Sequence, residues 1–365
     1  MKRFSLTAAA LTLLLALSSC EQKIKVESVV HPDGSIDRSI VLSEADSDKI
    51  DRNIFGASRV RGWETSIVPL ENKGDSVKDK KKKNTLSFHK HFPSVAAANA
   101  EMNSDTDTLF RIRSGFERKF RWFYTYINYS DTYIALNHFR MVKQEGYFTP
   151  EDYAFIERLP AEGKSISKAD SLYLSTLNTK IFDQFATRAL FEEYFQVLVQ
   201  VVQKNKLDRQ WIDKLNRQKE AIYSQLVKKG GDSLDDNFMV TWLIDSLHVP
   251  LANLVALKDN HELSSGLEKR INFVSDANEG KYTHIVKMPW AVVATNADSV
   301  NDTELFWHPP VTKFLLTDYT MYAESRRLNY WTLILSGVVM VATAFVFFKR
   351  RTTKASGKGG IDPNF

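Results

Sequence analysis

The chain of 365 residues contains one cysteine, Cys20, and therefore forms no disulfide within itself. Its fold has to depend on an apolar core, and a region of about 300 residues is long enough to bury one. Motifs of common enzyme classes are missing as well: no glycine-rich phosphate loop, Walker lysine or G-x-S-x-G turn occurs. These absences remove the local signatures of nucleotide-binding proteins and of α/β-hydrolases.

Metal-ligand patterns are sparse. Of the eight histidines, only His89 and His91 stand close enough in sequence to share an ion, on one face of an expected strand. No third ligand follows at a suitable spacing, and His261-Glu262 lacks the second histidine of a zincin helix. We therefore interpret His89 and His91 as a surface pair and predict no metal site and no cofactor.

Paired carboxylates do not indicate an acid–base site either. Asp235-Asp236 and Glu192-Glu193 are neighbours on expected helices, where adjacent side chains point in different directions. This pattern is typical of solvated helix faces, so no catalytic residue is predicted. A Ser/His/Asp site assembled from distant segments would leave no local trace, and a hydrolase therefore stays an alternative.

Basic residues outnumber acidic ones, with a formal net charge of +5 and a sequence pI near 9.0. The excess lies at the two ends of the chain. Between Cys20 and Phe348 there are 42 basic and 43 acidic side chains. Because the part that must fold is balanced in charge, its composition does not favour nucleic acid as a partner.

The first twenty residues have the three zones of a secretory signal. A basic pair is followed by an apolar run from Ala8 to Leu17 and by small residues before Cys20. The tetrad Leu17-Ser18-Ser19-Cys20 resembles the lipobox of bacterial lipoproteins. That resemblance implies that residues 1–19 are a signal peptide, that Cys20 becomes the mature N-terminus and that its sulfur carries lipid.

Near the other end, Trp331 to Phe348 is an uncharged run, WTLILSGVVMVATAFVFF. A helix of this length covers roughly 27 Å, close to the ~30 Å hydrocarbon core of a bilayer. Tyr330 and Trp331 suit one membrane interface, and the basic residues at the other are Lys349, Arg350 and Arg351. Length and apolarity predict a transmembrane helix over 330–348. The positive-inside rule then predicts a cytoplasmic tail over 349–365 and an extracytoplasmic region before the helix.

Hydrophobic periodicity divides the intervening region into three parts. Residues 20–136 and 271–329 show the alternation of β-strands, whereas residues 137–270 show helical periodicity, with a capped helix start at Thr149-Pro150-Glu151-Asp152. We expect an α+β fold in which an antiparallel β-sheet is built from N- and C-terminal segments and the central helical subdomain is an insertion. Two separate β domains are the alternative.

The most aromatic stretch runs from Leu109 to Ile134. Lys119, Arg121 and Phe123 fall on one parity. Five aromatic residues fall on the other, which predicts a long strand with one face in a core: Phe116, Phe120, Trp122, Tyr124 and Tyr126. Interleaved basic residues are also compatible with stacking on nucleic-acid bases. Outside the cytoplasm a packed sheet face is the better explanation, and no nucleic-acid partner is predicted.

A second resemblance lies in the β segments near the end of the ectodomain. There a P-x-x-V…N segment precedes a strand that ends in tryptophan, with matches at Pro289, Val292, Asn296, Asp298 and Trp307. This pattern resembles the domains of envelope lipoproteins related to mycobacterial LppM. The chain departs from the pattern in the helical block and at Trp290. The resemblance implies association with lipid surfaces and no catalytic residues.

Together these features predict a non-catalytic lipoprotein of the bacterial inner membrane, because helical spans are typical of that membrane. Its partners are membrane lipid, through acylated Cys20 and the transmembrane helix, and an envelope protein bound on the periplasmic side. The helical block or the aromatic strand is the expected binding surface. A lipid-handling LppM-like module and an envelope hydrolase are the alternatives.

Overall fold

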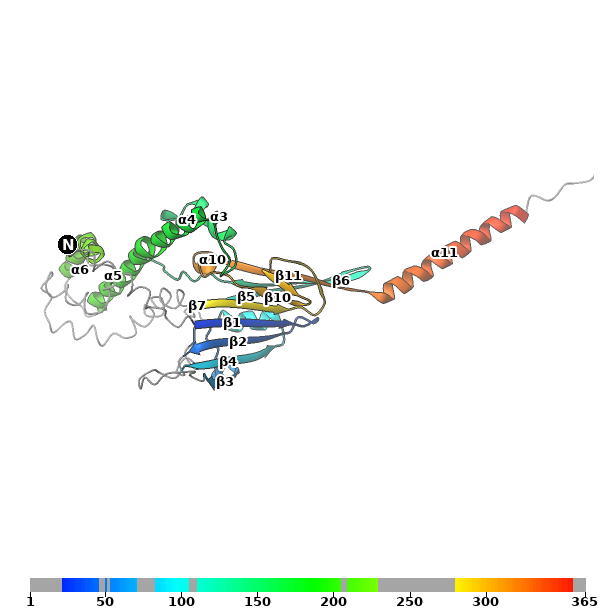
Figure 1. The fold of residues 1–365 in the computed structure, drawn as a ribbon, viewed down its shortest axis with the longest axis horizontal. Coiled ribbons are helices and arrows are strands. Elements are labelled where there is room, and N and C mark those ends of the chain that lie inside the picture. The colour runs from blue at the N-terminus through cyan, green and yellow to red at the C-terminus, as the bar shows by residue number, and fades with distance from the viewer. Residues whose placement is uncertain are drawn as a thin grey trace, which may run out of the picture.

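The computed structural model describes residues 22–45, 50, 53–70, 83–104, 110–204, 209–228 and 280–356. Two β-sheets stack face to face, with helices at one end of the stack and a single long helix at the other (Figure 1). Cys20 and the predicted signal peptide lie outside the described residues. So do residues 229–279 of the expected helical block and strands, and residues 357–365 of the expected tail.

The larger sheet combines strands from both halves of the chain, in the order β3-β4-β2-β1-β7-β10-β9. β1 and β7 pair in parallel, with Gln22 opposite Gly280, and the remaining described pairs are antiparallel. The strands are β1 (Gln22–Val30), β2 (Ile36–Ala45), β3 (Glu64–Pro69), β4 (Asn84–Phe92), β7 (Gly280–Lys287), β9 (Ser299–Asn301) and β10 (Glu304–Trp307).

The smaller sheet also joins both halves, in the order β5-β6-β11-β8. Its strands are β5 (Ile112–Arg121), β6 (Tyr124–Tyr133), β8 (Ala291–Thr295) and β11 (Tyr319–Leu328). The predicted α+β class and the pairing of N-terminal with C-terminal segments are confirmed. The prediction of one antiparallel sheet is wrong, because there are two sheets and one of them contains the parallel β1–β7 pair. The chain between the end of β1 at Val30 and the start of β7 at Gly280 is long enough for this pair, since parallel strands need a crossover.

The aromatic stretch forms a hairpin and not the single long strand that its period predicted. Arg121 pairs with Tyr124, so the two-residue turn is Trp122-Phe123. Across a two-residue turn, even-numbered residues of the first strand share a face with odd-numbered residues of the second, as Phe120 does with Thr125. Phe116 and Phe120 in β5 therefore lie on the opposite face from Tyr124 and Tyr126 in β6, and the set does not share one core-facing side. The turn has no glycine, asparagine or aspartate to reveal it in the sequence.

The helical arm is a nearly continuous helix with a second helix packed against it. We use this name for α4 (Lys168–Asn178), η4 (Thr179–Ala186), α5 (Thr187–Lys204) and α6 (Arg209–Lys228). Arg188 of α5 pairs with Glu220 of α6 at 2.7 Å and lies over the Tyr223 ring. The other short elements are η2 (Arg59–Arg61), α2 (Val95–Met102), η3 (Gln144–Gly146), α3 (Pro150–Arg158) and α10 (Thr312–Leu315).

The root of the arm is joined to α3 through a helix cap. Thr149 is the N-cap of the predicted helix start, and it forms a capping box with Asp152. The Asp152 carboxylate also accepts a hydrogen bond from the Tyr173 hydroxyl at 2.7 Å and pairs with the Lys180 ammonium at 2.8 Å. Burial opposes ionisation of this carboxyl, but Lys180 and the cap donors outweigh it and lower the pKa of Asp152 to about 2. The ionised Asp152 side chain is therefore one of the links between the arm and the domain.

The two sheets enclose an aromatic and aliphatic core. Phe110 stacks on Tyr282 with 5.4 Å between ring centroids and meets Tyr133 and Phe314 edge-on at 4.6 and 5.6 Å. These four rings come from both sheets, from α10 and from the segment before β5, and all are buried. Edge-to-face and stacked pairs of this kind add to the stabilisation that burial of the rings provides.

One ionised group lies in the middle of this core. The carboxylate of Asp131 on β6 is fully buried and faces five hydrogen-bond donors from both sheets: Ser28, Arg38, Ser114, Tyr129 and His284. The Arg38 guanidinium on β2 is 3.0 Å from Asp131 Oδ1, and both side chains have 0% exposure. Burial opposes ionisation of Asp131, but Arg38 and the donors outweigh it and hold the pKa well below its usual range.

The protonation of His284 follows from its neighbours. Burial lowers the pKa of the His284 imidazole, although Asp131 opposes this shift. Burial also raises the pKa of the Tyr133 phenol, which therefore keeps its proton. A neutral His284 then accepts from Tyr133 at Nδ1 (2.9 Å) and donates from Nε2 to Asp131 Oδ2 (3.0 Å).

Asp131→Ala should lower the free energy of unfolding by about 3–5 kcal/mol, because it leaves the Arg38 guanidinium buried without its counter-charge. Chemical denaturation of the detergent-solubilised chain measures the change. Glu117→Ala is the control, since Glu117 pairs with Lys119 on the surface and its loss should have little effect. Equal effects of the two substitutions would contradict the assignment.

The stability of the domain should also fall as the pH drops below about 6.5, the ordinary histidine pKa. Below that pH the unfolded chain binds a proton at His284 more readily than the folded chain, so protonation favours unfolding. His284→Gln should reduce the dependence of the unfolding free energy on pH below about 6.5, because it removes the group that binds a proton more readily in the unfolded chain. His89→Gln, which alters an exposed side chain, should leave it unchanged; the reverse ranking would refute the prediction.

Candidate membrane-contact site

α11 (Tyr330–Ser356) is the one helix among the described residues that is long and apolar enough to cross a membrane. The candidate span, Tyr330–Arg350, has 21 residues and a mean hydropathy of 2.2, and only 6% of it is buried. At 1.5 Å per residue it covers about 32 Å, which matches the hydrocarbon core of a bilayer. Its exposed apolar side chains include Ile334, Met340 and Val341.

The residues predicted for the two interfaces lie at the two ends of this span. Tyr330 and Trp331 begin the helix and are 72% and 55% exposed. Lys349 and Arg350 end the candidate span, and Arg351 follows in the same helix. The arrangement has an aromatic end next to the domain and a basic end beyond the apolar run.

The tip of the β5–β6 hairpin lies against the first two turns of α11. The Phe120 ring stacks on Trp331 with centroids 5.9 Å apart, and Trp122 meets the same ring edge-on at 6.1 Å. Trp122 Nε1 donates a hydrogen bond to Ser336 Oγ at 2.8 Å. Phe120, Trp122 and neighbouring Phe123 are still 57%, 47% and 43% exposed. The tip and the helix start therefore form one exposed aromatic collar.

Asn329 is the joint between the smaller sheet and α11. Its amide N–H donates to the Phe123 carbonyl at 2.8 Å, and its side-chain amide donates to the Arg121 carbonyl at 3.1 Å. Thr125 Oγ1 donates to Asn329 Oδ1 at 2.8 Å, and Thr332 Oγ1 donates to the Asn329 carbonyl at 2.6 Å. Because Asn329 is nearly buried and bonded on both sides, α11 is held to the hairpin in one orientation.

A basic–aromatic belt borders the collar. It consists of four arginines over three rings: Arg326 over Tyr124 at 4.5 Å, Arg121 over Tyr126 at 5.2 Å, and Arg327 and Arg118 over Trp290 at 4.7 and 6.0 Å. A guanidinium over an aromatic face keeps its charge while shedding part of its water. Cations and aromatic rings at this level suit lipid headgroups and the membrane interface.

Sequence reasoning located α11 and its flanks but missed the collar. Phe120 and Trp122 were assigned to a core face, and they are exposed because the chain turns at Trp122-Phe123. A hint was present, since three consecutive aromatic residues beside arginines are unusual for a buried strand. Only the pairing of β11 with β6 brings this turn next to Tyr330.

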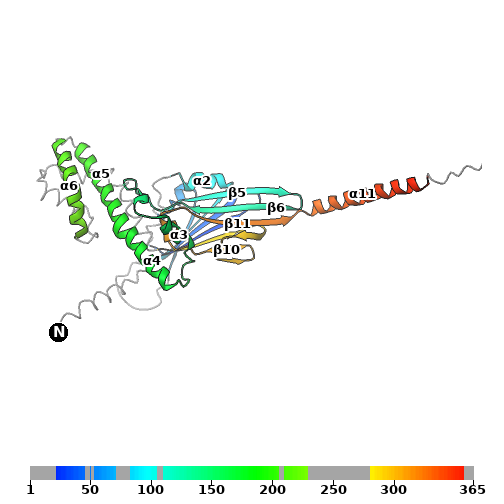
Figure 2. The same ribbon diagram turned by 90° about the horizontal axis from the view of Figure 1, so that it is seen from above.

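The start of β1 and the start of α11 lie at opposite ends of the domain. The turn after β1 lies beside the hairpin, because Arg118 donates to the Pro32 carbonyl at 3.3 Å. The start of β1 lies at the other end, where Gln22 pairs with Gly280. β1 has nine residues, which span about 30 Å, and Cys20 precedes Gln22 by only two residues, about 7 Å of chain at most. In Figure 2, α11 leads away from the end of the sheets, roughly along the strands.

The buried Ser28, His284 and Asp131 are of the residue types of a hydrolytic triad but lack its geometry. Ser28 Oγ donates to Asp131 at 2.8 Å, and His284 faces the same carboxylate and the Tyr133 hydroxyl. A nucleophilic serine has to donate to the histidine. All three side chains are fully buried, so this set gives the hydrolase alternative no support.

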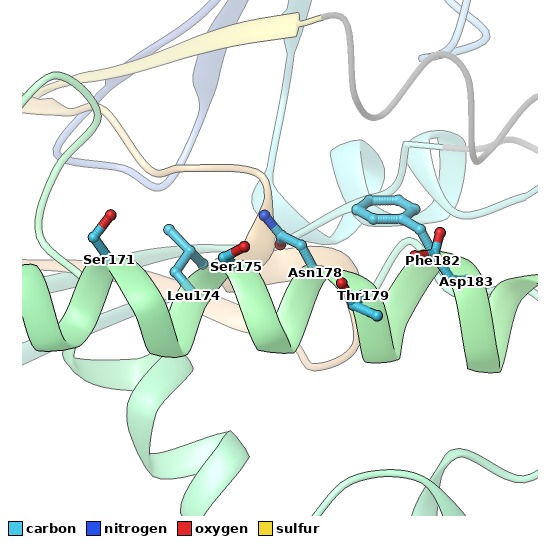
Figure 3. Close-up of a pocket in the computed structure, with 7 residues that line it drawn as sticks. All are labelled: Ser171, Leu174, Ser175, Asn178, Thr179, Phe182 and Asp183. Atoms are coloured by element: carbon cyan, nitrogen blue, oxygen red, sulfur yellow. The ribbon is translucent and has the colours of Figure 1, made fainter. Parts of the chain in front are cut away.

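A shallow pocket of about 400 Å³ runs along one face of the arm (Figure 3). Its lining is a helical stripe of mostly small polar residues: Ser171, Leu174, Ser175, Asn178, Thr179, Phe182 and Asp183. It contains one carboxylate and no histidine, so no acid–base pair lines it. Glu192 and Glu193 point to different partners, as predicted: Glu192 pairs with Arg188, and Glu193 accepts from the Arg140 backbone N–H. The prediction that they lie on a solvated helix face is wrong, because both side chains are buried against these partners.

The residues of the LppM-like pattern have structural partners. The buried Trp307 donates from Nε1 to Asn296 Oδ1 at 3.0 Å, and Asn296 also binds the backbone of β11 at Thr320 and Tyr322. Asp298 accepts from the His308 N–H at 2.6 Å. These contacts connect β10 with the smaller sheet.

Comparison with known proteins leaves the chain without a family. No family model matches it, and no curated protein matches its sequence. The NMR structure of the folded domain of LppM from Mycobacterium tuberculosis aligns over 86% of this chain and 93% of that one, at 10% identity and a TM-score of 0.26. This is a weak likeness, and it does not place the chain in the LppM family.

Proposed function

We propose that this chain is a non-catalytic, membrane-anchored protein of the bacterial envelope that holds a binding arm away from the membrane. The observation that carries the proposal is the aromatic collar around the start of α11. A helix whose apolar side chains are exposed over about 32 Å needs a lipid environment, and the collar has the rings that favour its interface. The arginine belt beside it suits anionic headgroups.

The joint at Asn329 determines how the domain stands. With α11 across the bilayer, its contacts with Asn329 and Trp122 keep the hairpin tip at the membrane surface. The strands then lead away from the membrane, and Gln22 and the arm lie at the far end. Laying the sheets flat, so that Cys20 and α11 reach the same bilayer, would break these contacts. We therefore propose that α11 and the collar orient the domain. Lipid on Cys20 would then provide an attachment at the opposite end.

The arm is the proposed binding surface for an envelope protein. It extends from the end of the sheets opposite α11 (Figures 1 and 2). Its root is buried in the core through Leu177, Ile181 and Phe185, so the arm is an extension of the domain and not a loose tail. Its surface carries Leu172, which is 72% exposed, and Val227, which is 48% exposed. Leu172 and Val227 are thus two exposed positions at which contact of the arm with a partner can be probed.

The position of the collar can be measured with an environment-sensitive dye. In proteoliposomes of the Cys20→Ser chain, a fluorophore attached at Phe123→Cys should emit at blue-shifted wavelengths and be quenched by spin-labelled lipid. The same dye at Leu172→Cys should behave as in water, because Leu172 is 72% exposed on α4 of the arm, which lies at the end of the sheets opposite α11. Water-like emission at both positions would contradict the proposed orientation.

The arm can be tested by photo-crosslinking in intact cells. A photoreactive amino acid at Leu172 or at Val227 should yield the same discrete adduct, since both positions lie on the arm. The matched control is the photoreactive residue at Val60, which is exposed but lies off the arm. Adducts that are equal at all three positions, or absent from both arm positions, would show that the arm is not the binding surface.

A further inference from the structure

A second cluster of chemically active side chains lies on the outer face of the larger sheet, apart from α11. Three residues meet there: His31 from the turn after β1, Asp37 from β2 and His91 from β4. His31 Nε2 is 2.8 Å from Asp37 Oδ2, and His91 Nδ1 is 2.6 Å from Asp37 Oδ1. The carboxylate thus lies between two imidazoles, and one donor atom of each residue lies within 4.8 Å of the others.

The backbone holds this set in place. Asp37 and His91 are direct cross-strand partners, so their side chains leave the sheet side by side. His31 is fixed by the turn, in which its N–H donates to the Ser35 carbonyl at 3.0 Å and its carbonyl accepts from Gly34 at 3.1 Å. The Asp33 side chain accepts from the Ser35 N–H and hydroxyl and closes the same turn. The ligand-bearing positions therefore come from three segments that the sheet has already brought together.

We propose that His31, Asp37 and His91 form a binding site for a divalent transition-metal ion, with Zn²⁺ as the best match. Two imidazoles and a carboxylate are the protein ligands of many zinc sites with one open position, and zinc bonds to nitrogen and oxygen are about 2.0–2.2 Å long. Ligand atoms on one tetrahedral ion are then roughly 3.4 Å apart, so small side-chain rotations bring the three donors into range.

The exposure of the cluster leaves room for a further ligand. The side chains of His31, Asp37 and His91 are 38%, 27% and 58% exposed. Water can complete the coordination sphere from the solvent side, as in sites with three protein ligands. A bound ion would link the turn after β1 to β4. It would thereby stabilise the part of the larger sheet that lies nearest the collar.

This site was not visible in the sequence. His89 and His91 were the only close pair, and the structure separates them: His89 Nδ1 bonds to Ser39 Oγ at 2.9 Å, whereas His91 binds Asp37. His31 is sixty residues from His91 along the chain. The two are brought together only by the pairing of β2 with both β1 and β4.

The test is zinc binding to the full-length chain in detergent after removal of metal with EDTA. Titration calorimetry with ZnCl₂ should show one equivalent bound, and thermal unfolding should shift upward with zinc concentration. Three substitutions should each weaken zinc affinity at least about tenfold: His31→Ala, Asp37→Asn and His91→Ala. Tenfold corresponds to about 1.4 kcal/mol of binding free energy for the loss of one ligand. With Co²⁺ in place of Zn²⁺, the wild-type chain should show the visible absorption of a four- or five-coordinate ion.

His89→Ala is the matched control, because it removes an exposed histidine from the same face of the same strand without touching the cluster. It should keep full zinc affinity and the cobalt spectrum. All variants should unfold at similar temperatures in EDTA, which separates loss of a ligand from loss of the fold. The proposal is overturned if the wild-type chain binds no stoichiometric zinc, or if His89→Ala weakens binding as much as His91→Ala.

Discussion

The buried carboxylate of Asp131 is the constraint on which the two-sheet architecture depends. It carries charge in the middle of an apolar core, and only Arg38 on the facing sheet neutralises it. Two nitrogens of Arg38, Nε and Nη1, have no hydrogen-bond partner among the described residues, which makes this pair costly to bury. Such a pair adds little net stability, but removing one partner is expensive. We interpret it as a device that specifies how the sheets stack, because three donors of the facing sheet, Ser28, Arg38 and His284, reach the same carboxylate.

The membrane end of the protein follows from that stacking. β6 carries Asp131 in its second half and leads back from the hairpin tip, so the position of the carboxylate in the core also positions Trp122 and Phe123. β11 lies beside β6 over its whole length and delivers Asn329 to the same tip. The collar, the joint and the first turns of α11 are thus one unit with the smaller sheet, and a rigid connection of this kind transmits the tilt of the helix to the domain.

The far end of the sheets has a different character. There Gln22, Gly280 and the root of the arm lie on the side away from α11. The Asp152 carboxylate and the aromatic contacts of Phe185 connect the arm to this end. The proposed binding surface and the proposed metal site are therefore separated, since His31 lies in a turn near the collar. Changes at one site need not alter the other.

The amino-acid sequence by itself determined the class of the fold, the apolar helix and its flanking residues, because these depend on periodicity and on long uncharged runs. The capped helix start at Thr149 was equally local and was confirmed. The turn at Trp122-Phe123, the joint at Asn329 and the meeting of His31 with Asp37 and His91 were decided only by the tertiary structure. Each depends on which strands become neighbours, and strand pairing is set by the packing of residues distant in the chain, such as Asp131 against Arg38. Lipid on Cys20 stays a prediction of the sequence, and the fold adds that its nearest described neighbour, Gln22, lies at the end opposite α11.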